Sequence, residues 1–318
     1  MIVLPFDDAR KTLNYLTAFR ADPSVCHRID FLTPLLAVSL CGAFNARRVS
    51  RTQVKFGNAA HTYAQNCGLL DPESDSQSAN KPLQGMTYCS IQRIRSPDDV
   101  DRCNESLTDL LCNQPENCRN QDLVRATSSV IGEIHDNVAS HANDQGFSAA
   151  QVYNREQKQI QIAVADIGRG IGGSIRSAGQ EYKDYNDRQA LEWCLVRGNT
   201  SAKLRQNSDS LLGPQKIDHY AFYNPFPSGT PVSSETNNHM GEGFYKLVEL
   251  IKETRGKTWI WSGNTSMLND KGFTHWIDPG LDWRGTIVAI EIPIDAFQTS
   301  PVAVNSAKFD ELAQRLKL

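Results

Sequence analysis

Apolar residues recur every three or four positions in some stretches of the chain and at every second position in others. The first pattern predicts helices and the second predicts strands. Helices are expected at residues 1–20, 34–44, 59–67, 122–142, 187–196 and 240–251, with a further one after Ser96-Pro97. Strands are expected at residues 25–31, 54–56, 87–94, 159–166, 256–261 and 283–293.

The order of these elements predicts two regions of unequal size. Strand, helix, strand and helix within residues 25–67 are typical of a small α/β module, which we place at residues 1–70. Residues 71–85 are polar and contain two prolines, which is the composition of a linker. The larger domain then spans residues 86–295, and residues 296–318 form a C-terminal tail.

Composition and charge narrow the classes of function. Of the 318 residues, 40% are hydrophobic and 22% are charged, and the formal net charge is −3. This balance gives no electrostatic basis for binding nucleic acid or an anionic membrane. The N-terminus lacks the basic and apolar segments of a signal peptide, and the apolar run at residues 31–44 is too short to span a bilayer. We therefore expect a soluble cytoplasmic protein without nucleic-acid or membrane partners.

The cysteines give little support for a metal site. Eight cysteines occur in the chain, and none forms a Cys-x-x-Cys pair. Cys103, Cys112 and Cys118 lie closest together, and a metal site there is the less favoured alternative. Free thiols in a reducing compartment are the favoured interpretation.

The helix expected at residues 122–142 carries the first candidate site residues. Its apolar positions form one stripe that should face a core: Leu123, Ala126, Val130, Ile134, Val138 and Ala142. Glu133 and Asn137 lie one turn apart on the adjacent stripe, about 6 Å from each other. An amide oxygen can coordinate Mg²⁺, and a carboxylate can deprotonate a water that attacks a γ-phosphate. A solvated helix face is the alternative, and it is favoured while this pair is considered alone.

A glycine-rich turn follows the strand expected at residues 159–166. Asp166 ends this strand, where its carboxylate can accept a hydrogen bond from an exocyclic amine. The turn supplies three further candidate contact residues: Gly168, Gly170 and Ile171. Glycines there allow the main chain to approach a flat ligand closely. The spacing fits neither a dinucleotide-binding fingerprint nor a Walker A loop, and a glycine-rich turn without a ligand is the alternative.

A second pair of glycines opens the helix expected at residues 240–251. Gly241 and Gly243 leave backbone N–H groups accessible to an anion, and Phe244 is the first core-facing position. Residues 200–238, which precede this helix, are polar and lack periodicity, as is typical of a lid.

In this order and at these separations the motifs resemble those of the GHKL (Bergerat-fold, histidine-kinase-like) ATPases. The resemblance covers about residues 87–293 and rests on four motifs: Glu133-x-x-x-Asn137 for the N box, Asp166-x-Gly168-x-Gly170 for the G1 box, Gly241-x-Gly243-Phe244 for the G2 box, and Gly285-Thr286 for the terminal Gly-Thr. The resemblance implies an α+β fold, a two-layer α/β sandwich with a mixed sheet, and an ATP lid at about residues 200–238.

The same resemblance assigns roles to individual residues. Glu133 is expected to be the catalytic base, and Asn137 is expected to ligate Mg²⁺. Asp166 and Thr286 are expected beside adenine. The remaining expected ATP contacts are Gly168, Gly170, Ile171, Gly241, Gly243 and Phe244.

The function that the resemblance implies is Mg²⁺-dependent binding and hydrolysis of ATP, used as a conformational switch on a protein partner. Two alternatives stay open: a serine/threonine kinase of the anti-sigma-factor type, and a regulatory module that holds nucleotide without turnover. Histidine kinases usually carry lysine three positions after the N-box asparagine, where this chain has Ser140. His135 lies within the N box and is not expected to accept phosphate. Homodimers are common in the family, and no motif here decides the oligomeric state.

Residues 1–70 resemble, more loosely, the STAS-like domains of anti-sigma-factor antagonists. The resemblance rests on the order of hydrophobic segments and on Tyr63 and Gly68 near the end. Those antagonists carry Asp-Ser where a loop enters a helix, and the serine is phosphorylated. Thr33-Pro34 occupies that place here, and we expect Thr33 to cap the helix rather than to accept phosphate.

Overall fold

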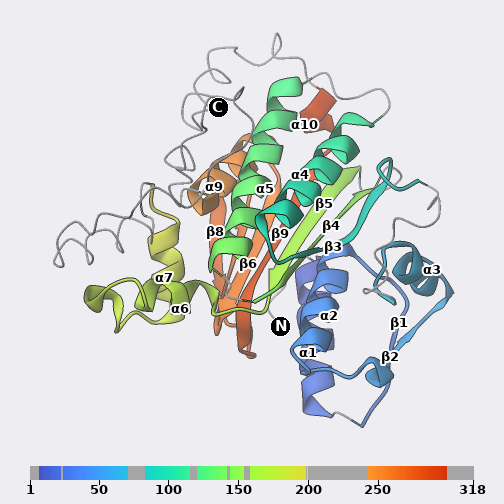
Figure 1. Cartoon of the computed structure of the whole chain (residues 1–318), viewed down its shortest axis with the longest axis horizontal. Coiled ribbons are helices and arrows are strands. Elements are labelled where there is room, and N and C mark those ends of the chain that lie inside the picture. The colour runs from blue at the N-terminus through green and yellow to red at the C-terminus, as the bar shows by residue number, and fades with distance from the viewer. Residues whose placement is uncertain are drawn as a thin grey trace, which may run out of the picture.

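A seven-stranded sheet forms the centre of the protein (Figure 1). The computed structural model describes residues 7–22, 24–70, 83–114, 120–141, 144–153, 158–197, 199 and 243–298. Along the sheet the strands follow the order β3-β4-β5-β9-β6-β7-β8. Their bounds are β3 (Tyr88–Ile94), β4 (Gly146–Tyr153), β5 (Gln159–Asp166), β6 (Lys257–Gly263), β7 (Thr265–Asp270), β8 (Phe273–Ile277) and β9 (Trp283–Pro293).

All neighbouring strands described in this sheet pair antiparallel, so the expectation of a mixed sheet is wrong. Two helices, α4 (Pro97–Cys112) and α5 (Gln121–His141), separate β3 from β4. They return the chain to the end of β3, so that Gly146 at the start of β4 pairs with Ile94. A crossover of one helix would instead have made these two strands parallel. At the centre, β9 runs antiparallel to both β5 and β6.

Helices cover one face of the sheet and share a hydrophobic core with it. Besides α4 and α5 they are α6 (Gly170–Arg176), α7 (Asp187–Cys194), α9 (Gly243–Thr254) and α10 (Asp295–Gln298), and a short 3₁₀ turn, η2 (Gln180–Tyr182), lies between α6 and α7. The apolar stripe expected on α5 is buried at Leu123, Ala126, Val130, Ile134 and Val138. Side chains of β5 alternate as expected, and Ile160, Ile162 and Val164 enter the same core.

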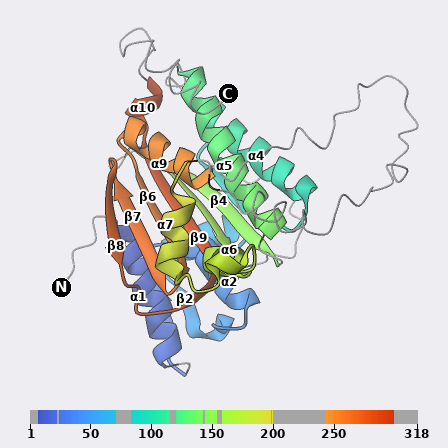
Figure 2. The same cartoon turned by 90° about the vertical axis from the view of Figure 1, so that its left-hand side faces the viewer.

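The opposite face of the sheet is covered by the N-terminal part of the chain (Figure 2). This layer contains α1 (Asp7–Ala21), β1 (His27–Ile29), α2 (Pro34–Asn45), the 3₁₀ turn η1 (Arg51–Gln53), β2 (Val54–Phe56) and α3 (Asn58–Asn66). Ala163 and Ala165 of β5 face this layer, and their small side chains let α2 lie close to the sheet. The first ten residues of α2 are all buried. Each fully buried Leu or Val contributes about 1.5–3 kcal/mol, so the two parts of the chain are held by a shared core.

The protein is therefore built in three layers, with helices on both faces of the sheet. We expected a two-layer sandwich preceded by a small α/β module. The difference arises because the reverse face of the sheet is itself apolar. It carries a row of indole rings, with 5.5 Å between the centroids of Trp259 and Trp261 and 5.7 Å between those of Trp261 and Trp283. The combination of helices and strands in a sandwich is confirmed, whereas the STAS-like resemblance and the domain boundary at residues 71–85 stay predictions.

Several elements were not anticipated from the sequence. These are β4, β7, β8, α6 and α10, together with the 3₁₀ turns η1 and η2, and α6 begins inside the stretch expected to be a glycine-rich turn. The expected cap of α2 is confirmed, because Thr33 Oγ1 accepts a hydrogen bond from the N–H of Leu36 at 3.2 Å. Gly241, the lid at residues 200–238, most of the linker and the tail beyond residue 298 lie outside the described residues.

The expectations about membrane-spanning segments and about the cysteines can be compared with the described residues. Within the described residues, the helices are all too short or too polar to cross a membrane. Within the described residues the cysteines form no disulfide, and those at positions 41, 67, 89 and 103 are buried. Cys118 lies outside the described residues.

Candidate functional site

Asp166, the last residue of β5, has a buried carboxylate that accepts hydrogen bonds from the backbone. Asp166 is 5% exposed. Its Oδ1 accepts from the N–H of Gly168 at 2.8 Å, and its Oδ2 accepts from the N–H of Thr286 at 3.0 Å. Burial raises the pKa of Asp166 to about 6, and the two backbone donors oppose that shift. The structure thus brings Asp166, Gly168 and Thr286 together, although they come from segments 120 positions apart.

Two glycines with positive φ allow this close arrangement. Gly285 has φ 114°, and a Cβ there would collide with the carbonyl oxygen of Asp166. Gly170 has φ 70°, and a Cβ there would lie 2.8 Å from both the carbonyl oxygen of Gly285 and Oγ of Ser262. The glycine requirement expected at position 170 therefore has a concrete cause, which is the packing of the turn against β6 and β9.

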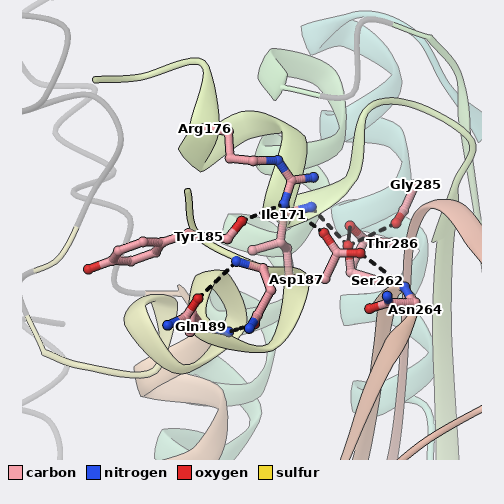
Figure 3. Close-up of polar contacts among 10 residues, drawn as sticks. Ile171, Arg176, Tyr185, Asp187, Gln189, Ser262, Asn264, Gly285 and Thr286 are labelled. Atoms are coloured by element: carbon pink, nitrogen blue, oxygen red, sulfur yellow. Dashed lines mark hydrogen bonds and ion pairs between the residues drawn. The ribbon is translucent and has the colours of Figure 1, made fainter. Parts of the chain in front are cut away.

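Ser262 and Trp283 hold the same turn and were missed from the sequence. The Ser262 hydroxyl accepts from the N–H of Ile171 at 2.9 Å and donates to the carbonyl of Gly285 at 3.0 Å (Figure 3). The indole N–H of Trp283 donates to the carbonyl of Asp166 at 3.0 Å. No local signal marks Ser262, whereas Trp283 stands two positions before Gly285 and could have been considered with it.

The second cluster of expected site residues lies between α5 and α9. Gly243 begins α9, and a Cβ there would lie 3.3 Å from Oε2 of Glu133 and 3.6 Å from Nδ2 of Asn137. The pair one turn apart on α5 therefore faces the start of α9 rather than open solvent. Phe244 is buried in the core beneath this contact.

Glu133 has a partner that the sequence analysis did not identify. Its side chain is buried, and its Oε1 accepts a hydrogen bond from the ammonium group of Lys246, with which it forms an ion pair. Lys246 stands one turn into α9, three positions after Gly243, and its own side chain is 12% exposed. The spacing from the glycine could have marked Lys246 as a member of the site. In this structure the carboxylate of Glu133 is therefore ion-paired with the ammonium group of Lys246.

The two clusters are joined through α5 and β5. A Cβ on Gly146 would collide with Val138 of α5, and it would lie 3.2 Å from the carbonyl oxygen of Ala165. Val138 follows Asn137 and Ala165 precedes Asp166, so the two clusters lie at the same end of the helix and the strand. Ile171 and Phe244 belong to one hydrophobic core below both.

His135 is a structural residue. It is fully buried, its Nδ1 lies 2.7 Å from Oδ1 of Asn104, and its Nε2 lies 2.8 Å from Oγ of Ser148. Burial lowers the pKa of His135 to about 3, so the imidazole is neutral. Both ring nitrogens are engaged, and neither is accessible to accept phosphate.

The described residues offer no cage for a metal. Among them, no three or more His, Cys, Asp or Glu side chains are grouped so that they could hold an ion. The role of Asn137 as a metal ligand and those of the other site residues stay predictions, and Gly241 lies outside the described part of the chain.

Comparisons with known proteins give little further guidance. No family model matches the sequence, and no curated protein matches it. A search of solved structures finds the histidine kinase domain from the Erythrobacter litoralis EL346 blue-light activated histidine kinase. The two chains are 12% identical over 93% of this chain and 98% of that one, with a TM-score of 0.26. A TM-score of this size supports no structural argument.

Proposed function

We propose that the protein binds ATP together with Mg²⁺, hydrolyses it, and uses the cycle as a conformational switch on a protein partner. The observation that carries this proposal is the position of Gly243, where an added Cβ would lie 3.3 Å from Oε2 of Glu133 and 3.6 Å from Nδ2 of Asn137. A helix start without a side chain thus faces a carboxylate and an amide, next to the buried Asp166. These residues are our candidates for the group that would bind adenine, the helix end that would bind phosphate and the catalytic base.

The residues present fit a magnesium nucleotide. Mg²⁺ prefers oxygen ligands, keeps several waters and often takes substrate phosphates, so it needs no cage of protein carboxylates. Asn137 is half-buried and supplies one amide oxygen. The carboxylate of Asp166 has about four lone-pair sites, of which backbone N–H groups use two, so it can accept further hydrogen bonds from an exocyclic amine.

The proposed roles of the side chains follow from this arrangement. Asp166 and Thr286 would bind the base, and the N–H groups at the start of α9 would bind phosphate. Bound Mg²⁺ would neutralise the phosphate charge. Glu133 would orient and deprotonate the attacking water. For that step the ammonium of Lys246 has to leave Glu133, and phosphate offers it an alternative anionic partner.

The switch would act through α9. This helix carries Lys246, begins at the proposed phosphate site and packs against α5 and the sheet. A change in the partner of Lys246 is therefore a change at the contact between two core helices. The lid expected at residues 200–238 would close over the same end, and the N-terminal layer would present the outcome to a partner protein.

Incubation of the purified protein with γ-labelled ATP tests the proposal. Release of free phosphate supports the proposal, and transfer of label to protein favours the kinase alternative. If neither phosphate release nor labelled protein is detected, the result favours a module that holds nucleotide without turnover. Glu133→Gln should lower hydrolysis by about a hundredfold or more, the usual size of a general-base contribution, while leaving ATP binding in place. Unchanged phosphate release in Glu133→Gln would refute its role as the base.

A further inference from the structure

A cavity of about 290 Å³ lies where α6, the start of α7, the end of β6 and the start of β9 meet one residue of the N-terminal layer. It is lined by Arg48, Arg169, Gly172, Arg176, Asp187, Ser262, Gly263, Asp282, Trp283 and Arg284. Four of these residues are arginines and two are aspartates, so the formal charge of the lining is +2. The proposed nucleotide site uses none of the arginines.

The arginines come from three separate segments. Arg48 follows α2 in the N-terminal layer, Arg169 precedes α6 and Arg176 is its last residue, and Arg284 is the second residue of β9. Folding therefore gathers four guanidinium groups that the sequence keeps far apart. Like charges repel, so such a gathering costs free energy unless an anion compensates it.

Arg176 is held in a defined position at the cavity wall. Its Nη1 donates to Oδ1 of Asp187 and to the carbonyl of Tyr185, both at 2.9 Å (Figure 3). Oδ2 of Asp187 accepts from the N–H of Asn264 at 3.0 Å. Gly172 and Gly263 make room for this carboxylate, because a Cβ on either would collide with it. The cavity wall thus contains a guanidinium that is held by two hydrogen bonds and belongs to a side chain that is 37% exposed.

The positive charges of the other three arginines are less well balanced by nearby carboxylates than that of Arg176. Within the described part of the chain, Arg48, Arg169 and Arg284 form no ion pair. The guanidinium of Arg48 lies 5.5 Å from the ring centroid of Trp283. Burial lowers the pKa of Arg48, and the charge of Arg284 lowers it further, although Asp282 opposes both. A bound dianion would relieve this repulsion.

We propose that this arginine-lined cavity is a binding site for a phosphoryl dianion, carried either by a small molecule or by a phosphorylated side chain of a partner protein. Guanidinium groups match phosphate oxygens with two parallel hydrogen bonds, and four of them around one cavity favour a dianion over a carboxylate. The volume is at the lower end of ligand pockets, so it suits a phosphoryl group on a small carrier rather than a whole nucleotide. The proposal does not depend on ATP hydrolysis.

Isothermal titration of the full chain with inorganic phosphate, and separately with a short phosphoserine peptide, tests the site. Arg48→Gln and Arg284→Gln should each weaken binding by about tenfold, which corresponds to the loss of one charge-assisted hydrogen bond. Tighter binding of the peptide than of phosphate identifies a phosphorylated protein as the source, and the reverse identifies a small molecule. Both results support the site.

A matched control and a conservative variant keep the test decisive. Arg188→Gln removes a guanidinium on α7 that pairs with Glu192 outside the cavity, and it should leave phosphate binding unchanged. Arg48→Lys keeps the charge and should bind more tightly than Arg48→Gln. Thermal unfolding of each variant checks that it is folded. Phosphate binding that survives both glutamine substitutions, or that is absent from the parent, would overturn the proposal.

Discussion

The two ends of the proposed nucleotide site hold buried carboxylates in different ways. Asp166 accepts hydrogen bonds from the backbone N–H groups of Gly168 and Thr286, and its surroundings are fixed by the packing of Gly285. Glu133 is about equally buried, but its described partner is the flexible side chain of Lys246. One end is therefore preorganised by the main chain, and the other can be rearranged by rotation of a single side chain.

This difference suits the two carboxylates to different proposed tasks, which are recognition of the base by Asp166 and hydrolysis of the nucleotide by Glu133. Backbone donors need no reorganisation when a ligand arrives, which suits a group that must bind the same base every time. A lysine on a flexible stem can exchange one anion for another, which suits a group that has to be released at one step of a cycle. The three predictions below test the rigid end, the adjustable end and the protonation of the rigid carboxylate.

The largest effect is expected at the rigid end, from Gly285→Ala. The added Cβ would collide with the carbonyl of Asp166, at a φ of 114° that L residues rarely adopt. Overpacking and backbone strain together should lower the free energy of unfolding by about 4 kcal/mol, measured by urea denaturation. Gly280→Ala is the control, because Gly280 also has positive φ but nothing lies within 4 Å of its added Cβ. If Gly285→Ala lowers the free energy of unfolding no more than Gly280→Ala does, the packing of Gly285 does not fix the surroundings of Asp166.

At the adjustable end, Lys246→Met should lower the free energy of unfolding by about 3 kcal/mol, because it leaves the buried Glu133 carboxylate without its cation. Combining it with Glu133→Leu should recover most of that loss, since an apolar pair of similar volume replaces the ion pair. The exposed pair of Arg188 and Glu192 is the control, and Arg188→Met should cost less than about 1 kcal/mol. If the double variant is no more stable than Lys246→Met, the two side chains are not coupled.

The smallest effect is a pH dependence caused by Asp166. Its folded pKa of about 6 lies above the ordinary aspartate value of 3.8, so the folded protein holds this proton more tightly than the unfolded chain. The stability that protonation contributes is present below about pH 4 and is lost as the pH rises to about 6, an amount of about 2 kcal/mol. Asp166→Asn cannot titrate, so the stability of the parent relative to this variant should fall over that range. His135 titrates in the opposite sense in both proteins and cancels in the difference.

Much of the local structure could be predicted from the sequence, because it depends on neighbours along the chain. The stripe on α5 and the alternation in β5 follow from periodicity alone, and both are confirmed. The pair Glu133 and Asn137 and the glycines after Asp166 are short patterns whose spacing is visible in the sequence without a fold. β4 was missed because its small residues, such as Ala149 and Ala150, weaken the alternation that marks a strand.

The contacts that complete the site could not be predicted, because they join distant segments. Lys246 meets Glu133 across 113 positions, and Trp283 meets Asp166 across 117. Nothing in the immediate neighbourhood of either residue indicates the other. The packing of the N-terminal elements on the sheet was missed for a similar reason: the alanines on the reverse face of β5 permit a helix to pack there but do not specify which one.

The row of indoles on the reverse face of the sheet provides an intrinsic fluorescence probe of the Asp166 turn. Trp259, Trp261 and Trp283 lie in a row with tilted rings, close enough for their excited states to couple, and Trp283 donates a hydrogen bond to the carbonyl of Asp166. Any movement of the Asp166 turn changes the surroundings of a chromophore already present. Intrinsic fluorescence can therefore follow events at that end of the molecule without a label.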